Sequence, residues 1–373
     1  MDPVRQIRTH KDQGRTIIAC FPLYPPLALL HSMGLVPIVL WGLRGHVFRT
    51  ESADRHLPAY TCSVARHLAE FLLTDGRELI DGIFMYNACD TLRNMPEILA
   101  DEMSAAERDV AFFCMHLPMT NQDQTGVPKY FGNEIKALVH DLSERFGIGF
   151  SPDRFQASVS LYQRMQRLAL DAMGRVAAGR LAFSDFVGVM QAGAFLPVED
   201  HIQAIAALPA LGGDDFVGQA SSSEDSRIGV MISGILPPPA SMIAAVESAG
   251  LRIVADDVAS LYRSYAVMPD PRPDPEEYYR IFYKEHYPCP TVLYTGDRRI
   301  SVFLARLAQS RARGVIFFGE KFCEYEYLEF PFLKKKLAEK GIPVLDIDVS
   351  IDDGRHMDAH DSRIAAFAEM LRQ

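Results

Sequence analysis

The stretch Arg15–Gly42, "RTIIACFPLYPPLALLHSMGLVPIVLWG", decides the fold of this chain. A short apolar run opens it, and two prolines, Pro25 and Pro26, follow that run. A helical stretch then ends at Gly34, where a C-terminal glycine stop is expected, and a second apolar run begins directly. Strand, helix and strand at this spacing predict a parallel βαβ unit.

The same unit recurs in the second half as "RIGVMISGILPPPASMIAAVESAGLRIVADD", from Arg227 to Asp257. Its prolines stand at the same offset from the opening arginine, and its helical stretch ends at Gly250. Each copy later adds another strand, turn and helix, in "DGIFMYNACDTLRNM" and in "RGVIFFGEKFCEYEYLEFPFL". We therefore predict an α/β fold with two Rossmann-like parallel lobes related by internal duplication.

A helical segment separates the two predicted lobes, because apolar residues recur there with helical spacing. The predicted organisation is an N-terminal lobe at 1–132, a helical segment at 133–220 and a C-terminal lobe at 221–373. "GQASSSEDSR", at 218–227, is typical of a linker. Ligands of open parallel sheets bind beyond the carboxyl ends of the strands, so a cleft between the lobes is the expected site.

The composition predicts a folded protein that binds no nucleic acid. Among 373 residues, 48% are hydrophobic, which is enough for a sizeable core, and the net charge of −10 comes without any block of Lys or Arg. Prolines break the apolar run from Ile17 to Trp41, so no membrane span is expected. We expect a cytoplasmic protein whose thiols stay reduced, where six cysteines favour metal or redox chemistry over disulfides.

Three cysteines share one local design. Cys62, Cys89 and Cys323 each stand where an apolar or loop segment gives way to a helix-like run. A thiolate in that position can accept backbone N–H groups and is stabilised by the positive end of the helix dipole. Three such thiolates suit an iron–sulfur cluster. Two alternatives stay open at this point: a Cys3His zinc site, although no C-x-x-C is present, and plain burial as small hydrophobes.

The other cysteines favour structural roles. Cys114, in "VAFFCMHLP", is predicted to lie buried in a strand interior. Cys20 ends the first strand and Cys289 lies in a proline-flanked loop; either could be an additional ligand, but core positions are favoured.

Acid–base candidates are weaker. His116 and His201 stand beside prolines at expected loop edges. Asp256 and Asp257 end a predicted strand of the second lobe, which suits either the cleft or a solvated turn. No Walker A, G-x-G-x-x-G or G-x-S-x-G motif is present, which disfavours nucleotide hydrolysis, dinucleotide binding and α/β-hydrolase chemistry.

These residues resemble the benzoyl-CoA reductase / 2-hydroxyglutaryl-CoA dehydratase subunit family. The matching pieces are "LPAYTCSVARH", "FMYNACDTLRN", "MQAGAFLPVEDH", "IVADD" and "KFCEYEYLEFPFLKKKL". The resemblance implies a [4Fe–4S] cluster held by Cys62, Cys89 and Cys323 in the cleft between the lobes. Three thiolates would leave one iron free of protein sulfur.

The resemblance also implies an activity and partners. Family enzymes of anaerobic metabolism act on acyl-CoA thioesters by low-potential one-electron transfer. A separate ATP-hydrolysing iron–sulfur activator supplies the electron, which fits the missing P-loop of this chain. The implied assembly is a heterodimer with a related, cluster-bearing partner.

Within the family, segments such as "FPLYPPLALLHSMGL" look closest to benzoyl-CoA reductase subunits, which reduce an aromatic acyl-CoA. Two alternatives are a 2-hydroxyacyl-CoA dehydratase, which eliminates water through a ketyl radical, and an electron-relay or structural partner subunit. A double-cubane reductase is disfavoured, because Ala259 and Ser260 stand where many relatives carry a cysteine. His31, on the helix that follows the first strand, is the first candidate for a catalytic residue near the cluster.

Overall fold

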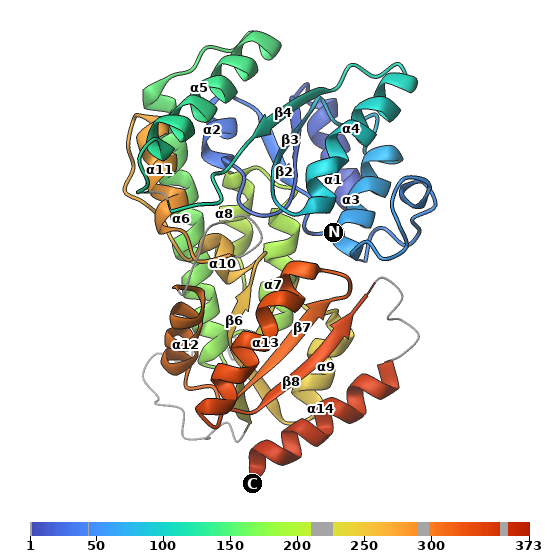
Figure 1. Ribbon diagram of the computed structural model, residues 1–373, viewed down its shortest axis with the longest axis vertical. Coiled ribbons are helices and arrows are strands. Elements are labelled where there is room, and N and C mark those ends of the chain that lie inside the picture. The colour runs from blue at the N-terminus through green and yellow to red at the C-terminus, as the bar shows by residue number, and fades with distance from the viewer. Residues whose placement is uncertain (1, 44, 122, 210–226, 290–297, 351–356) are drawn as a thin grey trace.

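The computed structural model describes residues 2–43, 45–121, 123–209, 227–289, 298–350 and 357–373. Two α/β lobes, each built on one parallel sheet, lie at the two ends of the long axis, with helices packed beside and between them (Figure 1). The predicted α/β class is therefore confirmed. No helix among these residues combines the length and the apolarity that a membrane crossing requires.

The N-terminal sheet has the strand order β2-β1-β3-β4, and all its strands are parallel. Its strands are β1 (Ile17–Cys20), β2 (Val36–Val39), β3 (Gly82–Tyr86) and β4 (Ala111–Met115). Its helices are α1 (Pro3–Asp12), α2 (Leu27–Ser32), α3 (Ser63–Leu73) and α4 (Asp90–Ala105), with a 3-10 turn η1 (Ala53–Arg55). The first three strands are buried along their whole length, as expected for a parallel sheet covered on both faces.

The C-terminal sheet has the order β6-β5-β7-β8 and is also parallel. Its strands are β5 (Ile228–Gly234), β6 (Leu251–Val258), β7 (Gly314–Glu320) and β8 (Val344–Val349). The helices of this half are α9 (Ala240–Ser248), α10 (Tyr262–Tyr265), α12 (Arg298–Ser310), α13 (Glu324–Glu339) and α14 (Met357–Arg372). Both predicted βαβ units are present. The two sheets share one strand order, as an internal duplication predicts, while the duplication itself stays a prediction.

The middle of the chain is helical, as predicted. It forms α5 (Val127–Phe146), α6 (Pro152–Ala177), α7 (Phe183–Gly193) and α8 (Val198–Ala206). Helix α6 contacts α2 of the N-terminal lobe and β6 of the C-terminal lobe, and α11 (Pro275–Glu285) packs back onto α5. The predicted linker lies outside the described residues except for Arg227, and the domain boundaries stay predictions.

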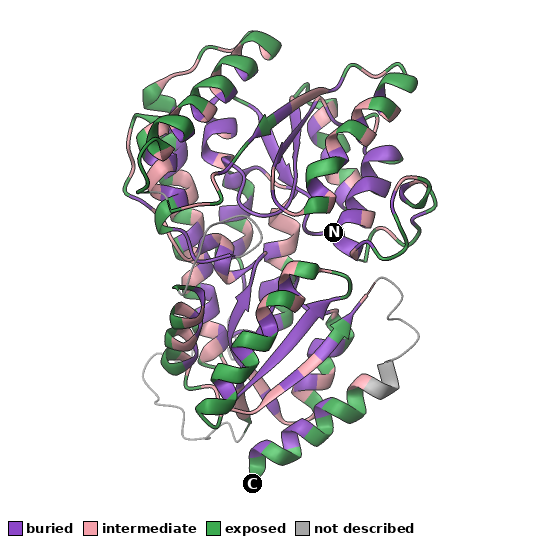
Figure 2. Cartoon of the chain, viewed as in Figure 1, coloured by how far each residue is buried: buried purple, intermediate pink, exposed green. Residues whose placement is uncertain are grey.

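The core of the N-terminal lobe extends across the junction between the lobes. Ile235 and Leu236, which follow β5, and Ala259, which follows β6, are buried in that core. Buried residues make up most of the inner strands of both sheets and continue between the lobes (Figure 2). The loops at the carboxyl ends of the strands are therefore held against packed side chains from both halves.

A close approach between α7 and α8 yields a stability prediction. A Cβ at Gly193 would lie 2.2 Å from the His201 ring, whereas a Cβ at Gly188, on the exposed face of α7, would contact nothing within 4 Å. We expect Gly193→Ala to lower the free energy of unfolding by about 1–3 kcal/mol through overpacking. Gly188→Ala, the matched control, should raise it by up to ~1 kcal/mol through helix propensity. Urea denaturation followed by circular dichroism measures both, and equal stabilities of the two variants would refute the packing argument.

Candidate functional site

The three candidate cysteines each stand directly before a helix. Cys62 precedes α3, Cys89 precedes α4 and Cys323 precedes α13, and each has the extended backbone of an N-cap residue. The predicted helix-start position is therefore confirmed for all three. An N-cap side chain faces the first backbone N–H groups of its helix, which have no partner within the helix.

Burial raises the pKa of all three thiols and is the largest influence on each of them. Nearby backbone N–H groups act in the opposite direction and favour the thiolate, although none of the three side chains makes a capping hydrogen bond. The amides come from the first turns of the helices: Val64 and Ala65 for Cys62, Thr91 and Leu92 for Cys89, and Glu326 for Cys323. Each helix N-terminus adds the positive end of its dipole. These groups offset only part of the effect of burial, and the pKa of each thiol still lies above its usual value.

The fold brings the three thiols within electrostatic reach of one another. Burial raises the pKa of Cys323 well above its usual range, and Glu326, Cys62 and Cys89 add to the rise. Cys323 belongs to the C-terminal lobe and the other two cysteines to the N-terminal lobe. The segments that carry Cys89 and Cys323 follow β3 and β7, beside the points where the strand order of each sheet reverses. Such switch points are where open parallel sheets bind ligands.

A single metal ion and a four-iron cluster place different demands on the three thiols. Burial raises the pKa of Cys62 to about 12, so without a metal the thiol stays protonated, and a bound metal would replace that proton. Within the part of the chain that the structure describes, no group of three or more His, Cys, Asp or Glu side chains could hold one metal ion, so no Cys3His zinc site is formed there. A four-iron cluster does not require the three sulfur atoms to meet at one ion, because each thiolate would bind a separate iron.

The turn before Cys323 is strained. Phe322 has a φ of +68°, in the left-handed region that bulky side chains rarely adopt. The Cys323 N–H donates to the Glu320 carbonyl at 2.8 Å, and the Lys321 N–H donates to the Val349 carbonyl at 2.9 Å. Strain held by surrounding contacts is common at binding sites. Here it fixes the position from which the Cys323 side chain leaves the backbone.

A buried glutamate near Cys323 adds little negative charge. Burial raises the pKa of Glu326 to about 8, so its carboxyl group is mostly neutral at pH 7. One of its oxygens, Oε2, accepts from the Glu320 N–H at 2.9 Å. A neutral carboxyl group repels a neighbouring thiolate far less than a carboxylate would. The Glu326 carboxyl group is therefore compatible with a negatively charged cluster beside Cys323.

The structure does not bring His31 to these thiols. His31 lies in the last turn of α2, at the amino end of β2, whereas Cys89 follows the carboxyl end of β3. Its Nδ1 is 2.8 Å from Ser158 Oγ on α6, and its Nε2 is 3.1 Å from Glu199 Oε1 on α8. These contacts support a structural role that joins α2 to the helical segment. A catalytic role for His31 stays a prediction that its position does not favour.

The remaining cysteines lie apart from this set. Cys20 and Cys289 are fully buried in the hydrophobic core, which supports the core role favoured for them. Cys114 does lie in a strand, β4, but the expectation that it is buried is wrong, because β4 is an edge strand and the side chain is exposed.

The two candidate acid–base histidines, His116 and His201, differ in their exposure to solvent. His116 is exposed, and its Nδ1 lies 3.7 Å from Glu134 Oε2. His201 is buried on α8.

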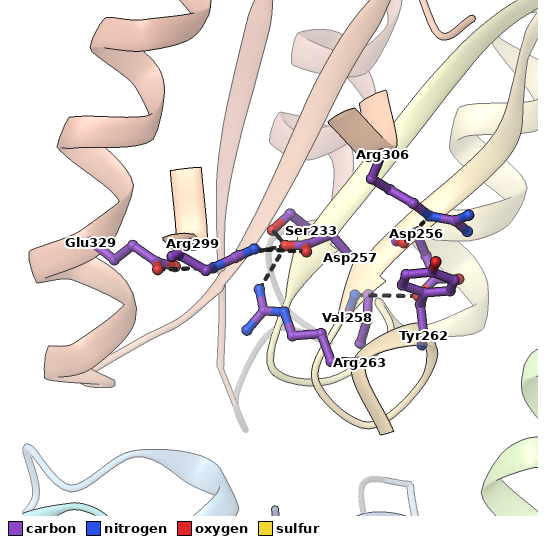
Figure 3. A network of polar contacts seen from close by, with 9 residues as sticks. All are labelled: Ser233, Asp256, Asp257, Val258, Tyr262, Arg263, Arg299, Arg306 and Glu329. Atoms are coloured by element: carbon purple, nitrogen blue, oxygen red, sulfur yellow. Dashed lines mark hydrogen bonds and ion pairs between the residues drawn. The ribbon is translucent and has the colours of Figure 1, made fainter. Parts of the chain in front are cut away.

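Asp257 lies at the centre of a buried ionic network (Figure 3). The sequence led us to expect either a cleft or a solvated turn at this residue, and it lies in neither. Its Oδ1 accepts from Arg299 at 2.9 Å, and its Oδ2 accepts from Arg299 at 2.6 Å and Arg263 at 2.7 Å. Ser233 donates to the same oxygen, and Arg299 continues to Glu329 at 2.9 Å. Because Glu329 lies on α13, the network ties the helix that begins after Cys323 to β5, β6, α10 and α12.

The neighbouring Asp256 gives a pH prediction. Its Oδ1 accepts from the backbone N–H groups of Val258 and Tyr262, and burial raises its pKa to about 6. Because an unfolded aspartate ionises at lower pH, the folded state binds more protons in this window, and stability falls as pH rises through about 6. Asp256→Asn should remove this loss, so its stability relative to the unmodified chain should increase by about 1 kcal/mol from pH 5 to pH 7. Urea denaturation at both pH values tests this, and a constant difference would contradict it.

Comparison with known proteins places these observations in a family context. The model of the family "2-hydroxyglutaryl-CoA dehydratase, D-component" matches residues 22–371. The (R)-phenyllactyl-CoA dehydratase beta subunit of Clostridium sporogenes is 23% identical over 99% of this chain and 96% of its own length. A benzoyl-CoA reductase subunit of Thauera aromatica is 24% identical over 97% and 92%. The beta subunit of the (R)-2-hydroxyglutaryl-CoA dehydratase of Acidaminococcus fermentans is 24% identical over 99% and 96%.

Proposed function

This chain belongs to the 2-hydroxyglutaryl-CoA dehydratase D-component family, and from that membership we propose that it is the [4Fe–4S] subunit of an enzyme acting on acyl-CoA thioesters. The observation that supports the proposal most is the convergence of three N-cap thiols from two lobes. Its relatives are named as subunits of acyl-CoA reductases and dehydratases.

Cys62, Cys89 and Cys323 would hold the cluster through their thiolates. When bound, the cluster would supply single electrons at low potential. The chain contributes the first-turn N–H groups of α3, α4 and α13, which stabilise negative charge on the sulfur atoms. Cys20 and Cys289 are enclosed in the core, so the proposed ligand set contains three cysteines, and one iron would carry no protein thiolate.

For the reaction, we propose one-electron reduction of an aromatic acyl-CoA, supported by the similarity to the benzoyl-CoA reductase of Thauera aromatica. Dehydration of a 2-hydroxyacyl-CoA is the second candidate, supported by equally similar dehydratase beta subunits. In either case a related cluster-bearing subunit and a separate ATP-hydrolysing iron–sulfur activator are proposed partners. The names of the relatives as subunits support the first of these. A chain that only relays electrons is a third possibility for the same complex.

The test is purification of the tagged chain with its bound partner under anoxia, followed by assays with activator, ATP and a low-potential reductant. Loss of benzoyl-CoA with formation of a ring-reduced thioester is the expected result. Dehydration of a 2-hydroxyacyl-CoA without ring reduction would select the second candidate. A complex with full iron that converts neither substrate would overturn both. Acyl-CoA binding by the partner alone, measured on separated subunits, would favour the relay role.

A further inference from the structure

Helix α13 carries a row of four exposed side chains along its outer side: Glu324, Leu328, Phe332 and Lys336. Residues four apart lie on one side of an α-helix, so these four side chains follow one line along its surface. The other side of α13 packs on β7 and β8 of the C-terminal sheet (Figure 1). The row therefore faces away from the sheet and into solvent.

Two apolar side chains form the middle of the row. Leu328 is 69% exposed and Phe332 is 65% exposed. Among the described residues that expose a large hydrophobic side chain, these are the two that stand four apart on one helix. Single exposed hydrophobic residues are ordinary on protein surfaces, whereas neighbouring ones favour a contact surface.

The two ends of the row carry opposite charges. Glu324 is the first residue of α13, and Lys336 lies in its last turn. Lys336 contacts Glu339 of its own helix at 2.9 Å, but both side chains are about half exposed, and such surface pairs contribute little stability. The lysine can therefore exchange this contact for a carboxylate of another chain.

The order acid, apolar, apolar, base identifies the partner. Leu328 and Phe332 lie two positions on either side of Phe330, so a two-fold axis at that level would place each opposite the other. Glu324 and Lys336 lie six positions on either side, so the same axis would pair them at both ends. A partner surface with one sign of charge would instead be attracted at one end of the row and repelled at the other.

We propose that this row is the contact surface for a second copy of this chain, with the two α13 helices packed antiparallel about a two-fold axis. Helix α13 has 16 residues and is about 24 Å long. Two such helices bury less than the roughly 800 Å² per partner of a standard stable interface, so the association depends on protein concentration. The proposal does not rest on the proposed function. A complex with a related subunit would contain two copies of this chain.

Sedimentation velocity of the full-length, anoxically purified chain over a series of concentrations tests the proposal. The buffer contains about 0.15 M salt, which screens the long-range repulsion between two chains of net charge −10. A monomer–dimer equilibrium is expected. Phe332→Ser removes two phenylalanines from each dimer and should weaken association at least about tenfold. Phe48→Ser, at a phenylalanine that is 81% exposed in the N-terminal lobe, is the matched control and should leave the equilibrium unchanged.

Charge reversals test the antiparallel register. Glu324→Lys would oppose two lysines at each end of the dimer, and Lys336→Glu would oppose two glutamates. Each variant alone should therefore dimerise about tenfold more weakly than the unmodified chain. An equimolar mixture of the two variants restores an opposite-charge pair at both ends and should dimerise as the unmodified chain does. Circular dichroism establishes that each variant is folded before it is measured.

Three results would overturn the proposal: an unmodified chain that stays monomeric at every concentration, a Phe332→Ser effect no larger than that of Phe48→Ser, or a mixture that associates no better than each variant alone. If Phe332→Ser impairs copurification of a related subunit while the unmodified chain alone stays monomeric, the row binds that subunit and the pairing of copies is likewise excluded. Because these measurements use neither iron nor activity, their failure leaves the tests of the proposed function unaffected.

Discussion

Replacing Cys89 or Cys323 by alanine is expected to abolish cluster binding by the anoxically purified chain. Each change removes one of three converging thiols, and a four-iron cluster with two protein ligands is not expected to survive purification. Iron should fall from about four per chain to well below one, and the broad visible absorbance should disappear. Enzymatic activity of the complex should be lost in parallel. Iron and acid-labile sulfide analysis measure the effect.

Cys114→Ala is the matched control, because that thiol is exposed on edge strand β4 and belongs to neither the core nor the candidate site. It should keep the full iron content and change the free energy of unfolding by less than about 0.5 kcal/mol. Full iron retention in both Cys89→Ala and Cys323→Ala would remove these residues from the ligand set.

Asp257→Ala is expected to lower the free energy of unfolding by about 3–5 kcal/mol. Burial alone would raise the pKa of Asp257, but the guanidinium groups of Arg263 and Arg299 outweigh burial and hold that pKa well below its usual range. Without the carboxylate, two buried guanidinium groups keep their charge, and Arg263 loses its ion-pair partner. Urea denaturation at pH 7 measures the loss.

Asp123→Ala is the control for this prediction, because its exposed carboxylate pairs with Lys284 at 2.6 Å in solvent. That change should cost no more than about 1 kcal/mol. Since the folded-state pKa of Asp257 lies below the unfolded value, its contribution is fully present at neutral pH and is lost as the pH falls below the unfolded pKa. Equal stabilities of the two variants at pH 7 would contradict the account of the network.

Much of the fold could be predicted, because local sequence patterns indicate both βαβ units. Apolar runs, prolines and glycine stops lie in order along the chain, and the structure places strands and helices accordingly. Helix α1 was missed, although Asp2 caps it by accepting from the Val4 N–H at 3.0 Å and Pro3 follows at the first helical position. The buried face of α1 consists of Pro3, Ile7 and His10. The segment therefore has little of the apolar spacing from which a helix is predicted, and its polar composition hid the capping signals.

The candidate site was only partly predictable. An N-cap position depends on a few neighbouring residues, so Cys62, Cys89 and Cys323 could be identified from sequence. The exposure of Cys114 depends on strand order, which a single strand does not reveal.

The ionic network around Asp257 depends on contacts between distant parts of the chain. Asp257 finds its partners on β5, α10 and α12. No local pattern marks residues that meet only after these elements have packed.

The most direct test of the central claim, three protein thiolates on a four-iron cluster, is the Mössbauer spectrum of the anoxically purified, ⁵⁷Fe-labelled chain before and after addition of a ligand that can bind a free iron site, such as cyanide. The account predicts a [4Fe–4S] signal in which about one quarter of the iron shifts on ligand addition, because one of four irons lacks a protein thiolate. A cluster whose irons all remain unchanged, or a chain that binds only mononuclear iron, would contradict it.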